Sequence, residues 1–112
     1  MSNRNVTTTF KEIQKNRILN LLAGSVQPSV KVKRIAWVAD VTETCDTCPA
    51  TRGLIKELIH EGHLIGSTND GYMLMSTAKE VQVYLNSLLK RQMGISRRIQ
   101  AVYDAAQRMG VL

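Results

Sequence analysis

The sequence predicts a mainly α-helical protein with one small β-hairpin and a long C-terminal helix. Aromatic residues make up only 4% of the 112 residues, so the core must consist of aliphatic side chains, which favours helices over a β-sandwich. A helical pattern that ends at Gly62 leads directly into two short apolar runs around a polar turn. Beyond Thr77, apolar residues recur at alternating spacings of four and three.

Length and charge limit the class of protein. A chain of 112 residues can form one domain with a core and one appended element. Fifteen Lys and Arg against nine Asp and Glu give a formal charge of +6, which favours a polyanionic partner. No apolar run approaches the roughly 18 residues of a transmembrane helix, and no secretory signal is present. We therefore expect a cytoplasmic protein with reduced cysteines and no membrane partner.

The N-terminal third predicts an arm and two helices. Residues 1–9 are polar and aperiodic, which indicates a flexible arm whose Arg4 is a possible phosphate contact. Helical spacing begins at Phe10 and ends near Gly24, which is placed as the C-cap. After Pro28, Ser29 is the predicted cap of a second helix that reaches Ala39.

Two alternatives remain open in the second helix. Its β-branched residues at 30–32 would also suit a short strand. Trp37, as a separate matter, could lie buried against the third helix.

The third predicted helix follows a polar turn at residues 40–47. Thr47 or Cys48 is the expected cap, Pro49 suits the first turn, and Gly62 stops the helix. The apolar positions predict a buried stripe, formed by Leu54, Ile55, Leu58 and Ile59. The remaining positions are expected on the outer surface: Thr51, Arg52, Lys56 and His60.

Residues 63–75 predict a β-hairpin. Apolar runs at 63–66 and 72–75 flank a loop at 67–71 that contains Asn69, Asp70 and Gly71. These residue types accept turn conformations and positive φ. The loop carries no Lys or Arg and is the expected tip of a wing.

The C-terminal segment, 77–112, predicts one long helix. Thr77 and Glu80 fit a capping box. From Val81 to Met109 the apolar positions form a coiled-coil seam, and Gly94 is a position where the helix could kink. The seam predicts either a homodimer or packing on the protein's own domain, through Leu85, Leu88, Gln92, Ile95, Ile99 and Val102. A basic strip beside it is a second DNA contact or a solvated face, and consists of Lys90, Arg91, Arg97 and Arg98.

One combination of residues resembles a zinc site. Cys45 and Cys48, followed by His60 and His63, have nearly the spacing of a two-Cys two-His finger. A continuous helix would, however, separate Cys48 from His60 by about 18 Å, too far for ligands of one ion. We therefore expect neither metal nor cofactor, and we expect the cysteines to pack near the turn. No catalytic set of residues is apparent, so we do not expect an enzyme.

Helix, helix, turn, helix and hairpin in this order resemble a small winged helix-turn-helix type that is common in bacteriophage genomes. In that type the recognition helix ends in Gly, the hairpin carries a Gly-Tyr pair, and a long basic helix closes the chain. Gly62, Gly71-Tyr72 and Lys90-Arg91 hold these places, and the resemblance covers roughly residues 12–100. It implies a DNA-binding protein of phage or bacterial origin, acting in transcription regulation or DNA replication.

The expected function is thus duplex DNA binding by a domain at residues 10–76, with the third helix in the major groove. Lys15 and Arg17 of the first helix are further phosphate candidates. The predicted DNA contacts are Lys31, Lys33, Arg34, Thr47, Thr51, Arg52, Lys56, Thr68 and Asn69. The alternative is an adaptor whose C-terminal helix docks on a replication or transcription protein.

Overall fold

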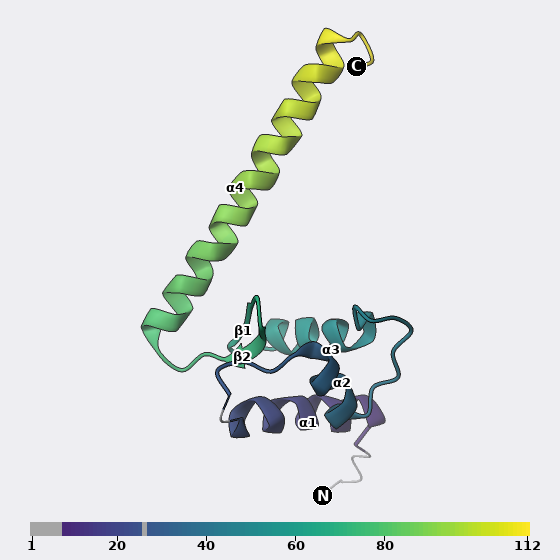
Figure 1. Cartoon of the computed structure of the whole chain (residues 1–112), viewed down its shortest axis with the longest axis vertical. Coiled ribbons are helices and arrows are strands. Elements are labelled where there is room, and N and C mark those ends of the chain that lie inside the picture. The colour runs from purple at the N-terminus through teal and green to yellow at the C-terminus, as the bar shows by residue number, and fades with distance from the viewer. Residues whose placement is uncertain (1–7, 26) are drawn as a thin grey trace, which may run out of the picture. The chain divides into compact units, whose positions relative to one another are not determined.

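The computed structural model describes residues 8–25 and 27–112. In these residues it contains α1 (Phe10–Gly24), α2 (Val32–Ala39), α3 (Pro49–His60), β1 (Ile65–Thr68), β2 (Gly71–Leu74) and α4 (Ala78–Arg108), shown in Figure 1. The prediction of a mainly helical protein with a hairpin and a long last helix is confirmed. The chain divides into two compact units, Met1–Ser76 and Thr77–Leu112. Residues 1–7 of the predicted arm, with Arg4, lie outside the described residues.

Helix α1 begins one residue after Thr9, which had been placed in the arm. The Thr9 hydroxyl accepts a hydrogen bond from the Glu12 amide at 3.1 Å and so caps the helix. At the other end Gly24 is still helical, and Ser25 is the C-cap with an extended backbone. The prediction of Gly24 as the cap is therefore wrong, because the chain leaves the helix without a left-handed residue.

Helix α2 starts later than predicted because the preceding residue pairs with the hairpin. Val30 forms a β-bridge with Tyr72, in which each amide donates to the other's carbonyl at 2.7 and 2.8 Å. Lys31, and not Ser29, is the N-cap. The alternative of a short extended segment is thus correct at Val30. Asp40, with a φ of 58°, ends the helix in the left-handed region.

Helix α3 is capped from a distance. Cys48 is the N-cap but makes no side-chain cap bond, and Pro49 occupies the first turn. The Glu43 carboxylate instead accepts from the amides of Ala50 at 3.0 Å and Thr51 at 2.5 Å. The helix ends as predicted before Gly62, which has a φ of 104°.

The hairpin is tighter than predicted. β1 and β2 are antiparallel, and the pairing runs from Ile65 with Leu74 to Thr68 with Gly71. The turn therefore contains only Asn69 and Asp70. Gly71 has a φ of 137°, and a Cβ atom there would lie 2.2 Å from the carbonyl oxygen of Val30. Only glycine fits where the turn meets the Val30 bridge.

The first unit has one aliphatic core to which α1, α2, α3 and the hairpin contribute. Two side chains depart from the prediction: Ile59 is 39% exposed, and Trp37 is 80% exposed rather than buried against α3. The core consists of Ile18, Leu22, Val30, Ile35, Ala39, Leu54, Ile55, Leu58 and Ile65.

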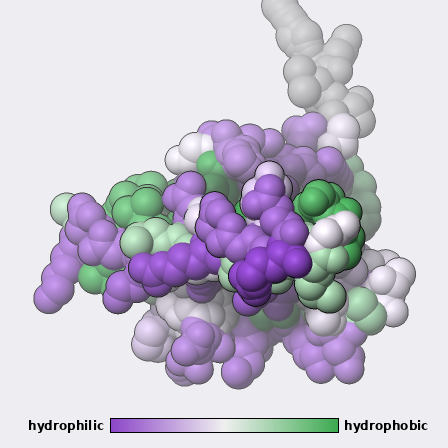
Figure 2. Space-filling model, turned by 90° about the horizontal axis from the view of Figure 1, so that it is seen from above, coloured by the Kyte–Doolittle hydropathy of each residue, from purple (hydrophilic) through white to green (hydrophobic). Residues whose placement is uncertain are grey.

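Helix α4 forms the second unit. Thr77 and Glu80 make both bonds of the predicted capping box, and the helix continues across Gly94 without interruption. None of its 31 residues is buried. Several of its large apolar side chains are exposed, and in the view of Figure 2 apolar residues lie among hydrophilic ones.

Candidate nucleic-acid interface

The face of α3 that points away from the core carries basic residues and no acidic residue. Thr51, Leu54, Ile55 and Leu58 are buried and define the inner side of the helix. Residues at helical spacing on the other side are exposed and include no acid. We call this set the outer face of α3: Pro49, Arg52, Gly53, Lys56 and His60.

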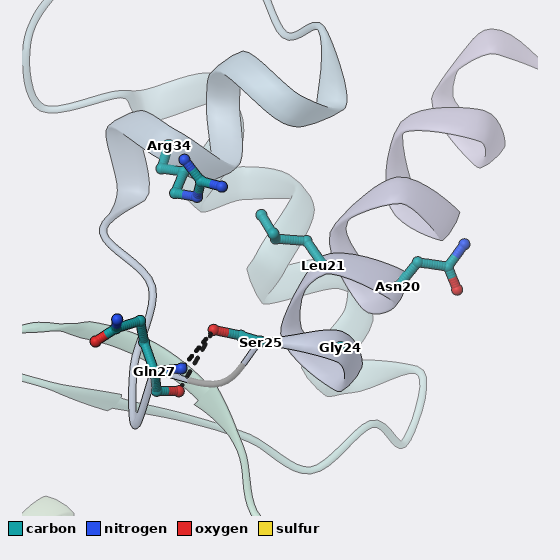
Figure 3. Close-up of a pocket in the computed structure, with 6 residues that line it drawn as sticks. All are labelled: Asn20, Leu21, Gly24, Ser25, Gln27 and Arg34. Atoms are coloured by element: carbon teal, nitrogen blue, oxygen red, sulfur yellow. Dashed lines mark hydrogen bonds between the residues drawn. The ribbon is translucent and has the colours of Figure 1, made fainter.

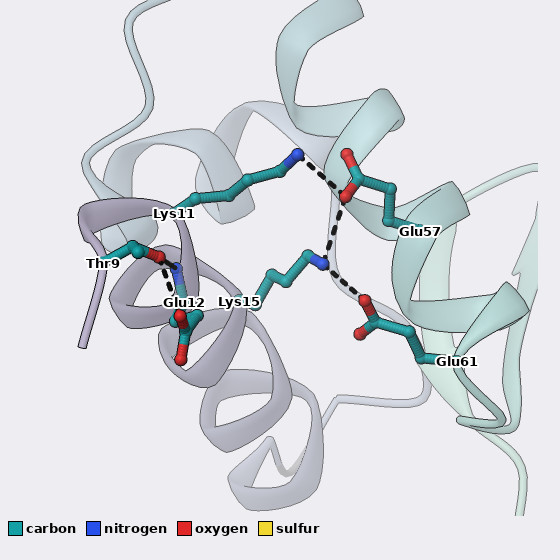
Figure 4. A network of polar contacts seen from close by, with 6 residues as sticks. All are labelled: Thr9, Lys11, Glu12, Lys15, Glu57 and Glu61. Atoms are coloured by element: carbon teal, nitrogen blue, oxygen red, sulfur yellow. Dashed lines mark hydrogen bonds and ion pairs between the residues drawn. The ribbon is translucent and has the colours of Figure 1, made fainter. Parts of the chain in front are cut away.

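The acidic residues at the end of α3 are turned toward α1. Lys11 contacts the Glu57 carboxylate at 2.9 Å, and Lys15 contacts Glu57 at 3.1 Å and Glu61 at 2.6 Å (Figure 4). The hydrogen bonds from Lys11 and then Lys15 lower the pKa of Glu57. The hydrogen bond to Glu61, followed by that to Glu57, raises the pKa of Lys15 against the opposing effect of desolvation.

This network changes the expected role of Lys15. Its side chain is only 13% exposed and has two carboxylate partners. Lys15 is therefore less available for a phosphate contact than predicted, because two carboxylates hold its ammonium group.

Arg52 is the most strongly fixed residue of the outer face. Its Nε donates to the Thr47 carbonyl at 2.6 Å, and its Nη1 donates to the Tyr72 hydroxyl at 2.8 Å. The guanidinium carbon also lies 5.9 Å from the centre of the Tyr72 ring. Arg52 is exposed nonetheless, so a planar cation is held at the N-terminal end of α3. The sequence identified Arg52 but gave no sign that Tyr72 supports it.

Thr51, in contrast, is fully buried. Its amide and its hydroxyl both donate to the Glu43 carboxylate. Its prediction as a surface residue and DNA contact is wrong, because it lies three and four residues before Leu54 and Ile55 and shares their phase. Desolvation raises the pKa of Glu43, but the hydrogen bonds from Thr51 and Ala50 together lower it below its ordinary value.

The start of α2 carries three basic residues, of which Lys31 lies next to the hairpin turn. Lys31, Lys33 and Arg34 are all exposed. The backbone nitrogen of Lys31 lies 2.9 Å from where a Cβ of Gly71 would be, so Lys31 flanks a hairpin turn that has no cation of its own. Lys33 reaches Asp46 at 3.6 Å, with both side chains exposed. Such a pair contributes little and leaves Lys33 able to change partners.

Two of the predicted wing contacts lie at the hairpin turn. The Thr68 hydroxyl accepts from the Asp70 amide at 3.1 Å and contacts the Gly71 carbonyl at 3.4 Å. It therefore stabilises the turn. Asn69 occupies the exposed tip.

A pocket of about 560 Å³ lies between the end of α1 and the start of α2 (Figure 3). The Ser25 hydroxyl accepts from the Gln27 amide at 3.1 Å. None of the described residues around the pocket is a carboxylate, cysteine or histidine, so they supply no nucleophile with a base. They are Asn20, Leu21, Gly24, Ser25, Gln27 and Arg34.

The cysteines and histidines of the zinc-like spacing occupy separate places. Cys48 is buried, and its thiol contacts the Asp46 carbonyl at 3.6 Å. Cys45 is exposed, and a hydrogen bond with the Thr47 hydroxyl at 3.0 Å lowers its pKa. All of α3 intervenes between Cys48 and His63. Within residues 8–25 and 27–112, no three His, Cys, Asp or Glu side chains gather closely enough to hold a metal ion.

Comparison with protein-family models, curated proteins and solved structures finds no match to this chain. Among the helices that the structure describes, none combines the length and apolarity needed to cross a membrane.

Proposed function

We propose that this protein binds duplex DNA as a winged helix-turn-helix protein, with the outer face of α3 in the major groove. The observation that carries the proposal is the separation of charge on α3. Arg52 and Lys56 face outward, whereas Glu57 and the following Glu61 are paired with α1 lysines. A helix with such a face suits the major groove, where arginine reads guanine through two hydrogen bonds.

Gly53 gives independent support. It lies on the outer face of α3, in the second turn, and no atom lies within 4 Å of a Cβ built there. A glycine inside a helix costs about 1 kcal/mol relative to alanine. No contact within the described chain requires it, and without a side chain there a partner's surface can approach the backbone of α3 closely.

The remaining contacts follow from the topology. The Val30 bridge joins the start of α2 to β2, and the Arg52 bond joins α3 to the same strand at Tyr72. Lys31 and Arg52 therefore flank one strand. In the proposed complex Arg52 and Lys56 contact bases, while Lys31, Lys33 and Arg34 contact phosphates, with Arg17, Thr47 and Asn69 at the edge.

The biological role that we propose is regulation of transcription or participation in replication, in the cytoplasm of a bacterial cell and without catalysis. The +6 charge supports a polyanionic partner. The resemblance of the sequence pattern to winged helix-turn-helix proteins supports the choice of DNA.

The test is a salt titration of binding to duplex DNA, followed by Arg52→Ala on a selected site. Affinity should fall steeply from low to moderate salt, because phosphate contacts release counterions. Arg52→Ala should weaken specific binding by about 1–3 kcal/mol and relax the base preference. Arg108→Ala is the control, since it removes the same charge from α4. Equal losses in the two variants would contradict a base contact by Arg52.

A second candidate is a protein-interaction adaptor, favoured by the exposed apolar side chains of α4 and by Trp37 on α2. Capture of a replication or transcription protein, with no DNA binding at low salt, would favour this function.

A further inference from the structure

Helix α4 carries an apolar seam along one side, and none of its residues is buried within the helix. The large apolar side chains of the seam are 38–64% exposed: Leu85, Leu88, Ile95, Ile99 and Val102. They recur at alternating spacings of three and four, with Gln92 at the centre. This is the repeat of a two-stranded coiled coil, and the flanking Tyr84, Leu89 and Tyr103 widen its apolar side. Gly94 lies off the seam, and the helix continues through it.

The residues that flank the seam discriminate between partner orientations. On one side, Arg91 and Arg98 directly precede the seam residues Gln92 and Ile99. On the other side, Ser96 and Tyr103 directly follow Ile95 and Val102. In coiled coils these flanking positions contact the partner helix and set its orientation.

A parallel pair of α4 helices has no repulsion at these positions. Arg91 would lie beside the partner's Ser96, and Arg98 beside the partner's Tyr103. The two Gln92 side chains would meet in one layer and satisfy each other's amides. An antiparallel pair would instead place Arg91 opposite Arg98 twice, and like charges at such positions are destabilising.

We propose that α4 forms a parallel two-stranded coiled coil with a second copy of this chain. We choose a second copy as the partner because two identical α4 helices, aligned in parallel, place like seam residues in the same layers and bring no like charges together at the flanking positions. A polar residue at the centre of such a seam also specifies register and oligomer state. Since each first unit joins α4 at Thr77, a parallel pair attaches both at one end of the coiled coil. If the proposed function holds, the two α3 helices then address an inverted repeat.

Sedimentation equilibrium of the full chain tests the oligomeric state. The wild type should be a dimer, and Ile95→Lys should shift it to monomer by placing two charges in one seam layer. Val83→Lys is the matched control, because Val83 is equally apolar and 61% exposed but lies off the seam. Thermal unfolding of the first unit reports whether Ile95→Lys still folds. A wild-type monomer or trimer would overturn the proposal.

Cysteine crosslinking tests the orientation. Leu85→Cys and Val102→Cys are made separately in a Cys45→Ser background, where Cys48 remains buried. In a parallel pair, each variant alone should form an interchain disulfide under mild oxidation. In an antiparallel pair, like positions would be about 26 Å apart, and only a mixture of the two variants would crosslink efficiently. Crosslinks confined to the mixture would overturn the parallel arrangement.

The outcomes are distinguishable from a failure of the proposed function. A dimer without affinity for duplex DNA supports the coiled coil and contradicts DNA binding. A monomer that binds DNA with a steep salt dependence supports DNA binding and contradicts the coiled coil.

Discussion

The two units of this chain stabilise their helices in different ways. The first unit buries nine core residues from α1, α2, α3 and the hairpin region. Helix α4 buries none of its 31 residues, although it has a complete capping box. Local signals thus define where a helix begins and ends, but packing provides most of the stability of helices in proteins. The comparison teaches that the first unit relies on its core, whereas within α4 the capping box and helix propensity are the stabilising features.

The largest effect is expected from Gly71→Ala, which acts on the first unit alone. The new Cβ would lie 2.2 Å from the Val30 carbonyl oxygen, at a φ of 137°. The variant must distort this turn and weaken the Val30 bridge, which we expect to lower the free energy of unfolding by about 3 kcal/mol. Urea unfolding measures the loss. Unfolding at the wild-type urea concentration would show that the turn can move without cost.

Glu43→Ala should have the next largest effect, again in the first unit. It removes the acceptor of two α3 amides and leaves the buried Thr51 hydroxyl without its partner. We expect a loss of about 2 kcal/mol in the free energy of unfolding. Glu12→Ala, at an exposed cap in α1, is the control and should cost less. An equal loss in both would mean that burial of Thr51 is unimportant.

The same carboxylate makes the first unit sensitive to acid. The folded protein lowers the pKa of Glu43 below its ordinary value of 4.5. Its contribution is therefore present at neutral pH and lost as the pH falls below about 4.5 and through the lowered pKa. Denaturation curves across this pH range should converge for wild type and Glu43→Ala. A constant difference between them would contradict the assignment.

Thr77→Ala tests how much the capping box at the start of α4 stabilises this helix. Loss of the Thr77 hydroxyl should cost about 1 kcal/mol of helix stability, because the Glu80 amide loses its acceptor and the capping box is left with one of its two bonds. Hydrogen exchange in the first turn should accelerate, while amides in the core of the first unit keep their protection. Ser87→Ala, inside the helix, should slightly increase helicity instead. Unchanged exchange in the first turn would show that packing, and not the cap, holds it.

The smallest effect has the opposite sign. A Cβ at Gly94 would meet no atom within 4 Å. Gly94→Ala should therefore stabilise α4 by about 0.5–1 kcal/mol, through helix propensity alone. Circular dichroism during heating measures it. Gly71→Ala and Gly94→Ala thus compare the effect of the same Gly-to-Ala change in the first unit and in α4. If Gly94→Ala destabilised the protein, this glycine would have to make a close contact in the assembled protein.

Local chemistry made much of the fold predictable. Pro49, Gly62 and the Thr77 capping box fixed three helix ends correctly, because their effects act within a few residues. The start of α2 was missed because Val30 pairs with Tyr72, far along the chain. The residue pattern around Val30 does not show that this residue pairs with a strand some forty residues later.

The candidate site was predictable where helix phase alone determines exposure. Arg52 and Lys56 lie on the expected side of α3. Thr51 was misplaced although its phase matches Leu54 and Ile55, since a threonine is polar and its acceptor, Glu43, lies in a preceding turn. The partners of Lys15 on α3 were likewise invisible in the sequence of α1.

The bonds that Arg52 makes to Thr47 and Tyr72 have a consequence for recognition. A free arginine side chain gives up about 2 kcal/mol of rotamer entropy when it is immobilised. Folding has already confined this guanidinium with bonds of 2.6 and 2.8 Å, so a partner that accepts its remaining donors meets a rigid, preorganised fork. Selectivity for flat, two-acceptor groups would then be set in the unbound protein, and Tyr72→Phe should reduce it without removing any charge.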